Sequence, residues 1–306
     1  MPNTDTRLVV TDGGLETWLI FDRGFELPAF AAYPLVADPD GRAALVDYYS
    51  HYVAIAAECG AGVQLDAPTW RANPDWAATL GHDLPQLTRL IHDGVALVAD
   101  LRAGWTGSEP FVVGGAVGPR GDGYVVGETM SADAAAEYHR FQMECLAAAD
   151  ADVATAMTIG YVDEAIGIAR AAEAAGLPVV ISFTVEVDGR LPSGSTLAEA
   201  IVETDEATGG YPAHYMVNCA HPTHFAGAID PSADWAQRIG GIRANASALS
   251  HAELDEAAEL DRGDPDDLAA RYVDLQASLP SIRVVGGCCG TDHTHVAKIA
   301  AALSAR

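Results

Sequence analysis

The feature that most constrains the fold of this chain is a short, β-branched run that recurs along it, each time followed by a turn and a longer stretch with helical spacing. We predict strands at 8–13, 62–67, 111–116, 152–157, 177–184, 213–219, 238–245 and 282–287. Helices are clearest at 42–60, 131–150, 161–176 and 265–278. Ser131 is a predicted N-cap, and Gly60 and Gly176 are predicted C-terminal stops.

Eight strands that alternate with helices over 306 residues favour an α/β fold, a single (β/α)₈ TIM barrel over residues 1–306. A doubly wound parallel sheet is the alternative. Hydrophobic residues make up 49 % of the chain, enough for a large core, and no linker-like tract divides it. The acidic stretch 251–267 is predicted to form an exposed loop and the start of a helix.

The charge balance argues against anionic partners. Seventeen Lys and Arg against 43 Asp and Glu give a formal charge of −26, which repels nucleic acid and anionic membranes. Residues 1–7 lack the apolar core of a signal peptide, and no stretch is long enough to span a membrane. We therefore expect a cytoplasmic protein, in which clustered thiols bind metal or react more often than they form structural disulfides.

Active sites of (β/α)₈ barrels lie where the strands end, at the C-terminal face. The residues that follow the predicted strands are Asp12, Gly13 and Gly14; Asp66 to Trp70; Met157 and Thr158; Asn218 and Cys219; Asn245; and Cys288 and Cys289. Three of the five cysteines thus stand at two strand ends. We expect these side chains to meet at the barrel mouth.

The chemistry of Cys219, Cys288 and Cys289 fits zinc, which prefers thiolate and imidazole ligands and in catalytic sites keeps one position open. The glycines around the adjacent pair would permit the backbone that points both sulfurs at one ion. Two alternatives stand beside zinc: a vicinal disulfide, or two ordinary thiols in a tight turn. His221 or His293 could close the site as a fourth ligand.

Three motifs carry a resemblance to a known family: "DGGLET" at 12–17, "VNC" at 217–219 and "GGCCGT" at 286–291. With weaker matches at 114–119 and 182–197, the chain resembles the homocysteine S-methyltransferase family, which includes betaine-homocysteine and S-methylmethionine-homocysteine methyltransferases. The resemblance implies a (β/α)₈ barrel and zinc held by the three cysteines. It also implies that Asp12 helps to hold the amino group of the thiol substrate.

The chain departs from the family pattern at two places. The family usually has a Glu-Thr pair after the fourth strand, whose carboxylate holds the ammonium, whereas this chain reads "TAMTIG" with Met157 at or next to that position. The family's Tyr-Pro-Asn segment after the seventh strand is here "RANAS" at 243–247, which keeps Asn245 and introduces Arg243. Both changes bear on which thiol is the acceptor.

These residues predict a zinc-dependent S-methyltransferase that moves a methyl group from a sulfonium or quaternary ammonium donor, of the S-methylmethionine, S-adenosylmethionine or betaine type, to homocysteine or a related small thiol. A free thiol is mostly protonated at neutral pH, and a metal ion favours the thiolate that alkyl transfer needs. The predicted substrate-binding residues are Asp12, Gly13, Gly14, Asn218 and Asn245. Methionine biosynthesis is the expected context.

Two further side chains and two further functions stay open at this point. Trp70 and Trp76 are either aromatic contacts for a cationic donor or hydrophobic anchors of their loop. The competing functions are a zinc-dependent hydrolase and a non-catalytic zinc- or thiol-binding barrel. The sequence fixes neither the methyl donor nor the oligomeric state.

Overall fold

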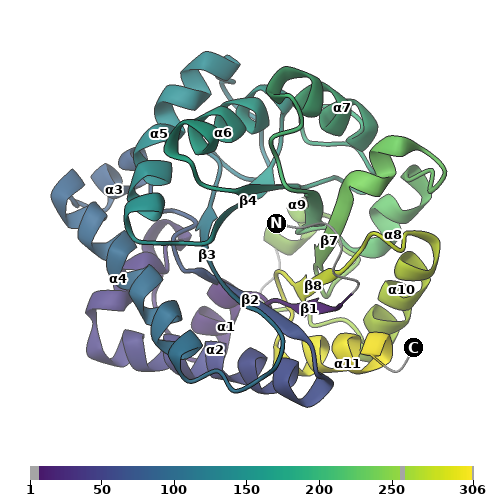
Figure 1. The fold of residues 1–306 in the computed structure, drawn as a ribbon, viewed down its shortest axis with the longest axis horizontal. Coiled ribbons are helices and arrows are strands. Elements are labelled where there is room, and N and C mark those ends of the chain that lie inside the picture. The colour runs from purple at the N-terminus through teal and green to yellow at the C-terminus, as the bar shows by residue number, and fades with distance from the viewer. Residues whose placement is uncertain (1–6, 256–258, 305–306) are drawn as a thin grey trace.

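The chain folds into a closed barrel of eight parallel strands in sequence order, surrounded by helices (Figure 1). The computed structural model describes residues 7–255 and 259–304, without the side chain of Asp255. The strands are β1 (Val9–Val10), β2 (Gly62–Ala67), β3 (Phe111–Val117), β4 (Val153–Ile159), β5 (Val179–Phe183), β6 (Tyr215–Asn218), β7 (Ile239–Ala244) and β8 (Val284–Gly287). All of the predicted strands and the TIM barrel are confirmed, and closure of β8 onto β1 rules out the doubly wound sheet.

The helices surround the barrel, except that α9 (His251–Asp255) lies over its mouth, where His251 contacts the Cys219 carbonyl (Figure 1). The helices are α1 (Leu15–Phe21), α2 (Pro39–Cys59), α3 (Pro74–Thr79), α4 (Leu84–Ala103), α5 (Ala132–Ala148), α6 (Val162–Ala175), α7 (Leu197–Thr208), α8 (Pro222–Phe225), α9, α10 (Pro265–Ser278) and α11 (His293–Ser304). Short 3₁₀ turns occur at Pro28–Phe30, Tyr33–Ala37, Ala226–Ala228 and Asp234–Arg238. None of the helices within the described ranges is long and apolar enough to cross a bilayer.

The local signals behind the helix predictions are confirmed. Ser131 caps α5 by accepting a hydrogen bond from the backbone N–H of Ala134. Gly60 and Gly176 end α2 and α6 in the left-handed conformation, with φ of 63° and 68°. Within the predicted acidic segment, α9 and the start of α10 are helical, and residues 256–258 lie outside the described ranges.

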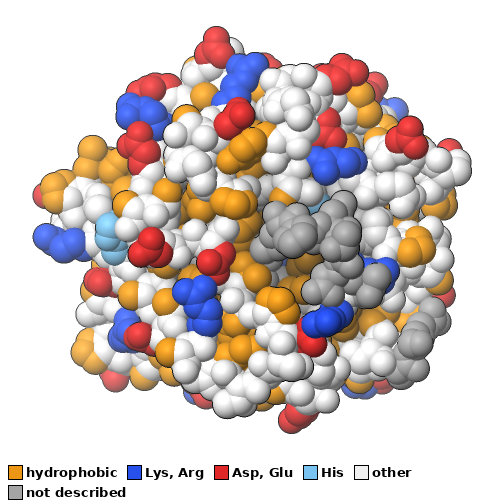
Figure 2. Space-filling model, in the orientation of Figure 1, with side chains coloured by type: hydrophobic (Ala, Val, Ile, Leu, Met, Phe, Trp, Pro, Cys, Tyr) orange, Lys and Arg blue, Asp and Glu red, His pale blue; other side chains and the backbone are white. Residues whose placement is uncertain are grey.

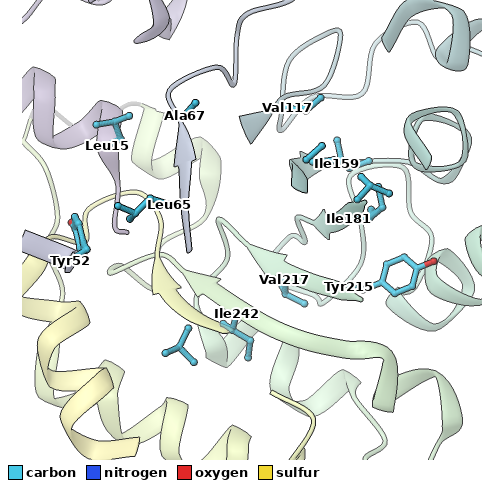
Figure 3. Close-up of a cluster of buried hydrophobic side chains, with 14 of the residues drawn as sticks. Leu15, Tyr52, Leu65, Ala67, Val117, Ile159, Ile181, Tyr215, Val217 and Ile242 are labelled. Carbon is cyan, nitrogen blue, oxygen red and sulfur yellow. The ribbon is translucent and has the colours of Figure 1, made fainter. Parts of the chain in front are cut away.

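The main hydrophobic core lies between the barrel and its helices (Figure 3). Side chains such as Leu65, Ile181 and Ile242 leave the strands on the outer face and are fully buried there. The acidic side chains that give the chain its net charge are interspersed with basic and hydrophobic ones on the face drawn in Figure 2.

The barrel interior contains a second, separate apolar cluster. Val153, Val180, Met216 and Val284 pack together there, and we call these four residues the barrel floor. Val153 and Val284 are the first residues of their strands, so the floor lies toward the N-terminal ends of the strands. Since alternate residues of a strand share a face, the chain continues on the inner side with polar residues such as Thr155 and Asn218. The interior therefore changes from apolar to polar toward the mouth.

Candidate active site and metal centre

The three predicted cysteine ligands meet at the barrel mouth. Cys219 directly follows β6, and Cys288 and Cys289 directly follow β8. The three Sγ atoms lie within 4.8 Å of one another, and no His, Asp or Glu within the described ranges joins this cluster. His293 instead stacks on His51, and His221 caps α8. A fourth protein ligand that closes the site is thus not found among the described residues.

A disulfide in this structure joins Cys219 to Cys288, across the ends of β6 and β8. The vicinal disulfide between Cys288 and Cys289, considered from the sequence, is therefore not the pairing that forms. A metal ion takes thiolates and not a disulfide, so this pair must be reduced before a metal binds. With that condition, three converging sulfur donors form a suitable ligand set for zinc.

Each of the three sulfurs has a polar group beside it. The Thr158 hydroxyl lies 3.8 Å from Cys219 Sγ, and Asn218 Nδ2 lies 3.9 Å from Cys288 Sγ. The Tyr124 hydroxyl lies 3.8 Å from Cys289 Sγ. Such donors stabilise negative charge on sulfur and orient metal ligands. Residues from three different segments therefore support the cysteine cluster.

Asn218 and Asn245, both predicted as pocket residues, contact the cysteines or their backbone. Asn218 is fully buried, and its amide oxygen accepts hydrogen bonds from the Ser182 hydroxyl at 2.6 Å and the Thr158 backbone N–H at 2.9 Å. Asn245 Nδ2 donates to the Cys219 carbonyl at 3.1 Å. That bond supports Cys219 in a left-handed conformation with φ of 53°, which is unfavourable for a residue with a side chain.

Gly13 and Gly14 line the pocket and pack against the loop that carries the cysteine pair. A Cβ atom on Gly14 would lie 2.5 Å from the Cys288 carbonyl oxygen, so a larger residue would displace this loop. The Gly14 backbone N–H also donates to the Thr291 carbonyl at 3.1 Å. The start of α1 and the end of β8 are thus held together at the site.

Three charged side chains lie buried beside the cysteines, and we call Asp12, Asp66 and Arg243 the charged layer. Arg243 Nη2 lies 2.5 Å from Asp12 Oδ1, and Arg243 Nη1 lies 3.4 Å from Asp66 Oδ2. Burial raises the pKa of Asp12 and raises that of Asp66 to about 6, although Arg243 opposes both shifts. Arg243, which the sequence marked as a departure from the family, is therefore central to the site.

A glycine on the neighbouring strand β3 provides the space that the charged layer needs. A Cβ atom on Gly114 would lie 1.9 Å from Asp66 Oδ1, so only glycine fits beside this carboxylate. Asp66 Oδ1 also accepts a hydrogen bond from the Thr155 hydroxyl at 2.8 Å. The "GG" of β3, noted from the sequence only as a weak family match, thus has a steric role.

A pocket opens directly beside the three sulfurs and the charged layer. Met157, Phe30 and Trp70 contribute apolar walls, and Glu16 adds a further carboxylate. Met157 therefore lies in the pocket, as its position in the family pattern implied. Burial raises the pKa of Glu16 to about 7, and the nearby Asp12 charge adds to that rise.

A second cavity adjoins this pocket. The two share Thr17, Phe30, Trp70, Tyr124 and Cys289. The arrangement provides two compartments that meet at one of the sulfurs, which suits a reaction between two substrates.

Trp70 and Trp76 differ in position. Trp70 lines both cavities, whereas Trp76 lines neither. The guanidinium carbon of Arg71 lies 4.0 Å from the ring centroid of Trp70 and 4.3 Å from that of Trp76. Arg71 is thus a cation that these rings already hold.

Three residues that line the candidate site were not singled out from the sequence. Glu16 lies inside the "DGGLET" motif but was not considered as a separate charge, and Asp66 appeared only as a strand end. Tyr124 lies in the loop after β3, where no periodicity marks it. The signals for the first two were a carboxylate within a motif and a carboxylate at the end of a barrel strand.

Comparisons with known proteins agree with this geometry. The sequence profile described as homocysteine S-methyltransferase matches residues 9–303. The chain belongs to the homocysteine S-methyltransferase family. Its members are methyltransferases, and so is this enzyme.

Solved structures of a bacterial relative share the fold. The Escherichia coli homocysteine methyltransferase MmuM in its metallated form is 22 % identical, with a TM-score of 0.72 over 98 % of this chain and 97 % of that one. The oxidized form of the same enzyme is 23 % identical, with a TM-score of 0.73 over the same shares. No curated protein sequence matches the chain significantly.

Proposed function

We propose that this methyltransferase is zinc-dependent and transfers a methyl group from a sulfonium or quaternary ammonium donor to homocysteine or a related small thiol. The observation that carries the proposal is the convergence of Cys219, Cys288 and Cys289 beside a pocket, in a chain of this family. The homocysteine methyltransferase named among the structural relatives supports the acceptor, and its metallated form supports a metal.

The reduced Cys219, Cys288 and Cys289 would hold the zinc ion. Zinc, when bound, supplies a Lewis acid that favours the thiolate form of the acceptor at neutral pH. Asn218, Thr158 and Tyr124 orient the sulfurs, since each places a polar group beside one of them.

Other residues of this chain shape the space for the substrates. Asp12, Gly13 and Gly14 line the acceptor pocket, and Arg243 holds the Asp12 carboxylate. Asn245 acts through the Cys219 carbonyl. Trp70 faces both compartments and bounds the space in which donor and acceptor meet. Apolar walls exclude water there, which favours a reaction that neutralises a cationic donor.

The test is zinc content combined with zinc-edge X-ray absorption of the reduced protein, with and without homocysteine. We expect one zinc per chain with three sulfur neighbours, and a fourth sulfur when homocysteine is added. Methyl transfer is then assayed with S-methylmethionine, S-adenosylmethionine and betaine. A protein that binds no zinc, or whose zinc environment ignores thiols, contradicts the proposal. The cytoplasm is the compartment in which we expect the reduced cysteines.

A further inference from the structure

Among the described residues, four Asp, Glu or Arg side chains line the pocket beside the sulfurs. They are the three of the charged layer and Glu16. The charged layer compensates itself, because the Arg243 guanidinium pairs with both of its carboxylates. The remaining Arg243 contacts are to backbone: Nε donates to the Gly287 carbonyl at 3.1 Å and Nη2 to the Gly13 carbonyl at 3.2 Å. This guanidinium is committed to the protein on all sides.

The two carboxylates of the layer are committed as well. Asp12 Oδ2 accepts a hydrogen bond from the Tyr48 hydroxyl at 3.2 Å, and its other oxygen faces Arg243. Asp66 Oδ1 accepts from the Thr155 hydroxyl. A cationic substrate group that bound to either aspartate would have to displace a buried ion pair, which is costly.

Glu16 has no such partner. It is the second residue of α1 and is half-buried. Within the described ranges no ion pair and no hydrogen bond from another side chain reaches its carboxylate, although a backbone hydrogen bond at Glu16 itself favours the charged form. The other guanidinium that influences it, that of Arg71, lies against Trp70 and donates to the Gly121 carbonyl at 2.8 Å. A partly buried carboxylate that has no ion-pair partner is stabilised when a cation binds beside it.

We propose that Glu16 is the specificity residue that binds the ammonium group of an α-amino-acid thiol acceptor. The proposal rests on the proposed thiol methyltransferase function. Glu16 lines the compartment that contains all three sulfurs and does not line the adjoining cavity, which places it with the acceptor and not with the onium donor. Arg243 has the complementary role, because it withholds Asp12 from the same ammonium group.

The test uses the zinc-loaded protein and the isosteric variant Glu16→Gln. Homocysteine is compared with 4-mercaptobutyrate, which has the same thiol and carboxylate but no amino group. Binding is measured by titration calorimetry, and KM and kcat are measured where turnover occurs. We expect Glu16→Gln to weaken homocysteine binding about 10- to 100-fold, as for loss of a hydrogen bond to a charged group, and to leave 4-mercaptobutyrate within about 2-fold. The control Glu203→Gln, an exposed glutamate on α7, should change neither.

The outcomes separate this proposal from the function on which it rests. Equal weakening of both thiols, or no weakening of either, overturns the assignment of Glu16 to the ammonium group. A rise in the KM of the methyl donor with both acceptors alike also overturns it, and assigns Glu16 to the onium group. If wild-type protein binds 4-mercaptobutyrate as tightly as homocysteine, the ammonium site fails while the thiol site stands. If it binds neither thiol, both proposals fail.

Discussion

The two ends of the barrel interior are equally buried and chemically opposite. In the floor, Val153, Val180 and Met216 are 1–2 % exposed, and the charged layer is hardly more exposed, with Asp12 at 4 % and Arg243 at 5 %. The floor stabilises the fold by removing apolar surface from water. The charged layer carries the cost of desolvated ions, which the Arg243 pairs offset. The mouth therefore carries the candidate site at a cost in desolvation, whereas the floor contributes to stability through apolar burial alone.

The largest expected effect is the loss of a sulfur at the mouth. Cys288→Ala should abolish stoichiometric zinc binding and lower methyl transfer by more than about 100-fold, beyond what loss of a supporting residue costs. Metal analysis of the reduced variant, with a methyl-transfer assay, checks this. Cys59→Ser, at the end of α2 and outside the cluster, is the control and should keep its zinc. A Cys288→Ala protein with full activity would contradict the assignment of the three cysteines as a catalytic metal site.

The next effect concerns Arg243. Arg243→Met leaves two buried carboxylates without their cation, so we expect it to lower the free energy of unfolding by about 3–5 kcal/mol at pH 8. The loss should be smaller at pH 5, because carboxyl groups such as Asp66, whose pKa is already raised to about 6, are then neutral. Urea unfolding at both pH values measures it. The control Arg271→Met breaks an exposed pair on α10 and should cost less than about 1 kcal/mol.

A change in the floor should behave differently. Met216→Ala creates a cavity among apolar side chains, so we expect a loss of about 2–4 kcal/mol. The loss should be equal at pH 5 and pH 8, since the four floor residues do not titrate. The same urea experiments measure it. A strong pH dependence would show that the floor and the charged layer are coupled and would break the comparison.

The smallest effect is a gain in stability. The pKa of Glu16 rises from 4.5 to about 7 on folding, so the folded state holds the extra proton between these values and stability falls as the pH rises through them. Glu16→Gln removes this loss and should stabilise the protein by about 1–3 kcal/mol at pH 8, with little change at pH 4. Thermal unfolding at the two pH values tests it; equal effects at both would show that Glu16 is not desolvated.

The sequence predicted the strands and the clearest helices because these signals are local: β-branched runs, helical spacing and caps such as Ser131. The convergence of the three cysteines was also predictable, because the C-terminal ends of all barrel strands lie at one face. The partners of Arg243 were not predictable in this way. Asp12 lies at the other end of the barrel sequence, and only closure of the barrel brings the two together.

The role of Glu16 escaped the sequence for a different reason. Its significance depends on what its neighbours do, since a carboxylate is notable there only after those of Asp12 and Asp66 prove to be paired. No pattern in a single sequence shows which carboxylates are paired with a cation in the folded protein. The positions of Tyr124 and Trp70 were likewise set by loops, in which periodicity gives no orientation.

The short first strand gives the Arg243 contacts a mechanical meaning. β1 pairs with its neighbours through only Val9 and Val10, which makes it the shortest strand in the barrel. Arg243 bridges this seam, because it contacts Asp12 and the Gly13 carbonyl after β1 and the Gly287 carbonyl in β8. The amide of Thr11, which donates to the Val285 carbonyl across the seam, should then exchange with deuterium at a rate set by this guanidinium. Arg243 therefore both balances the charge of the site and connects the two strands, β1 and β8, at which the barrel closes.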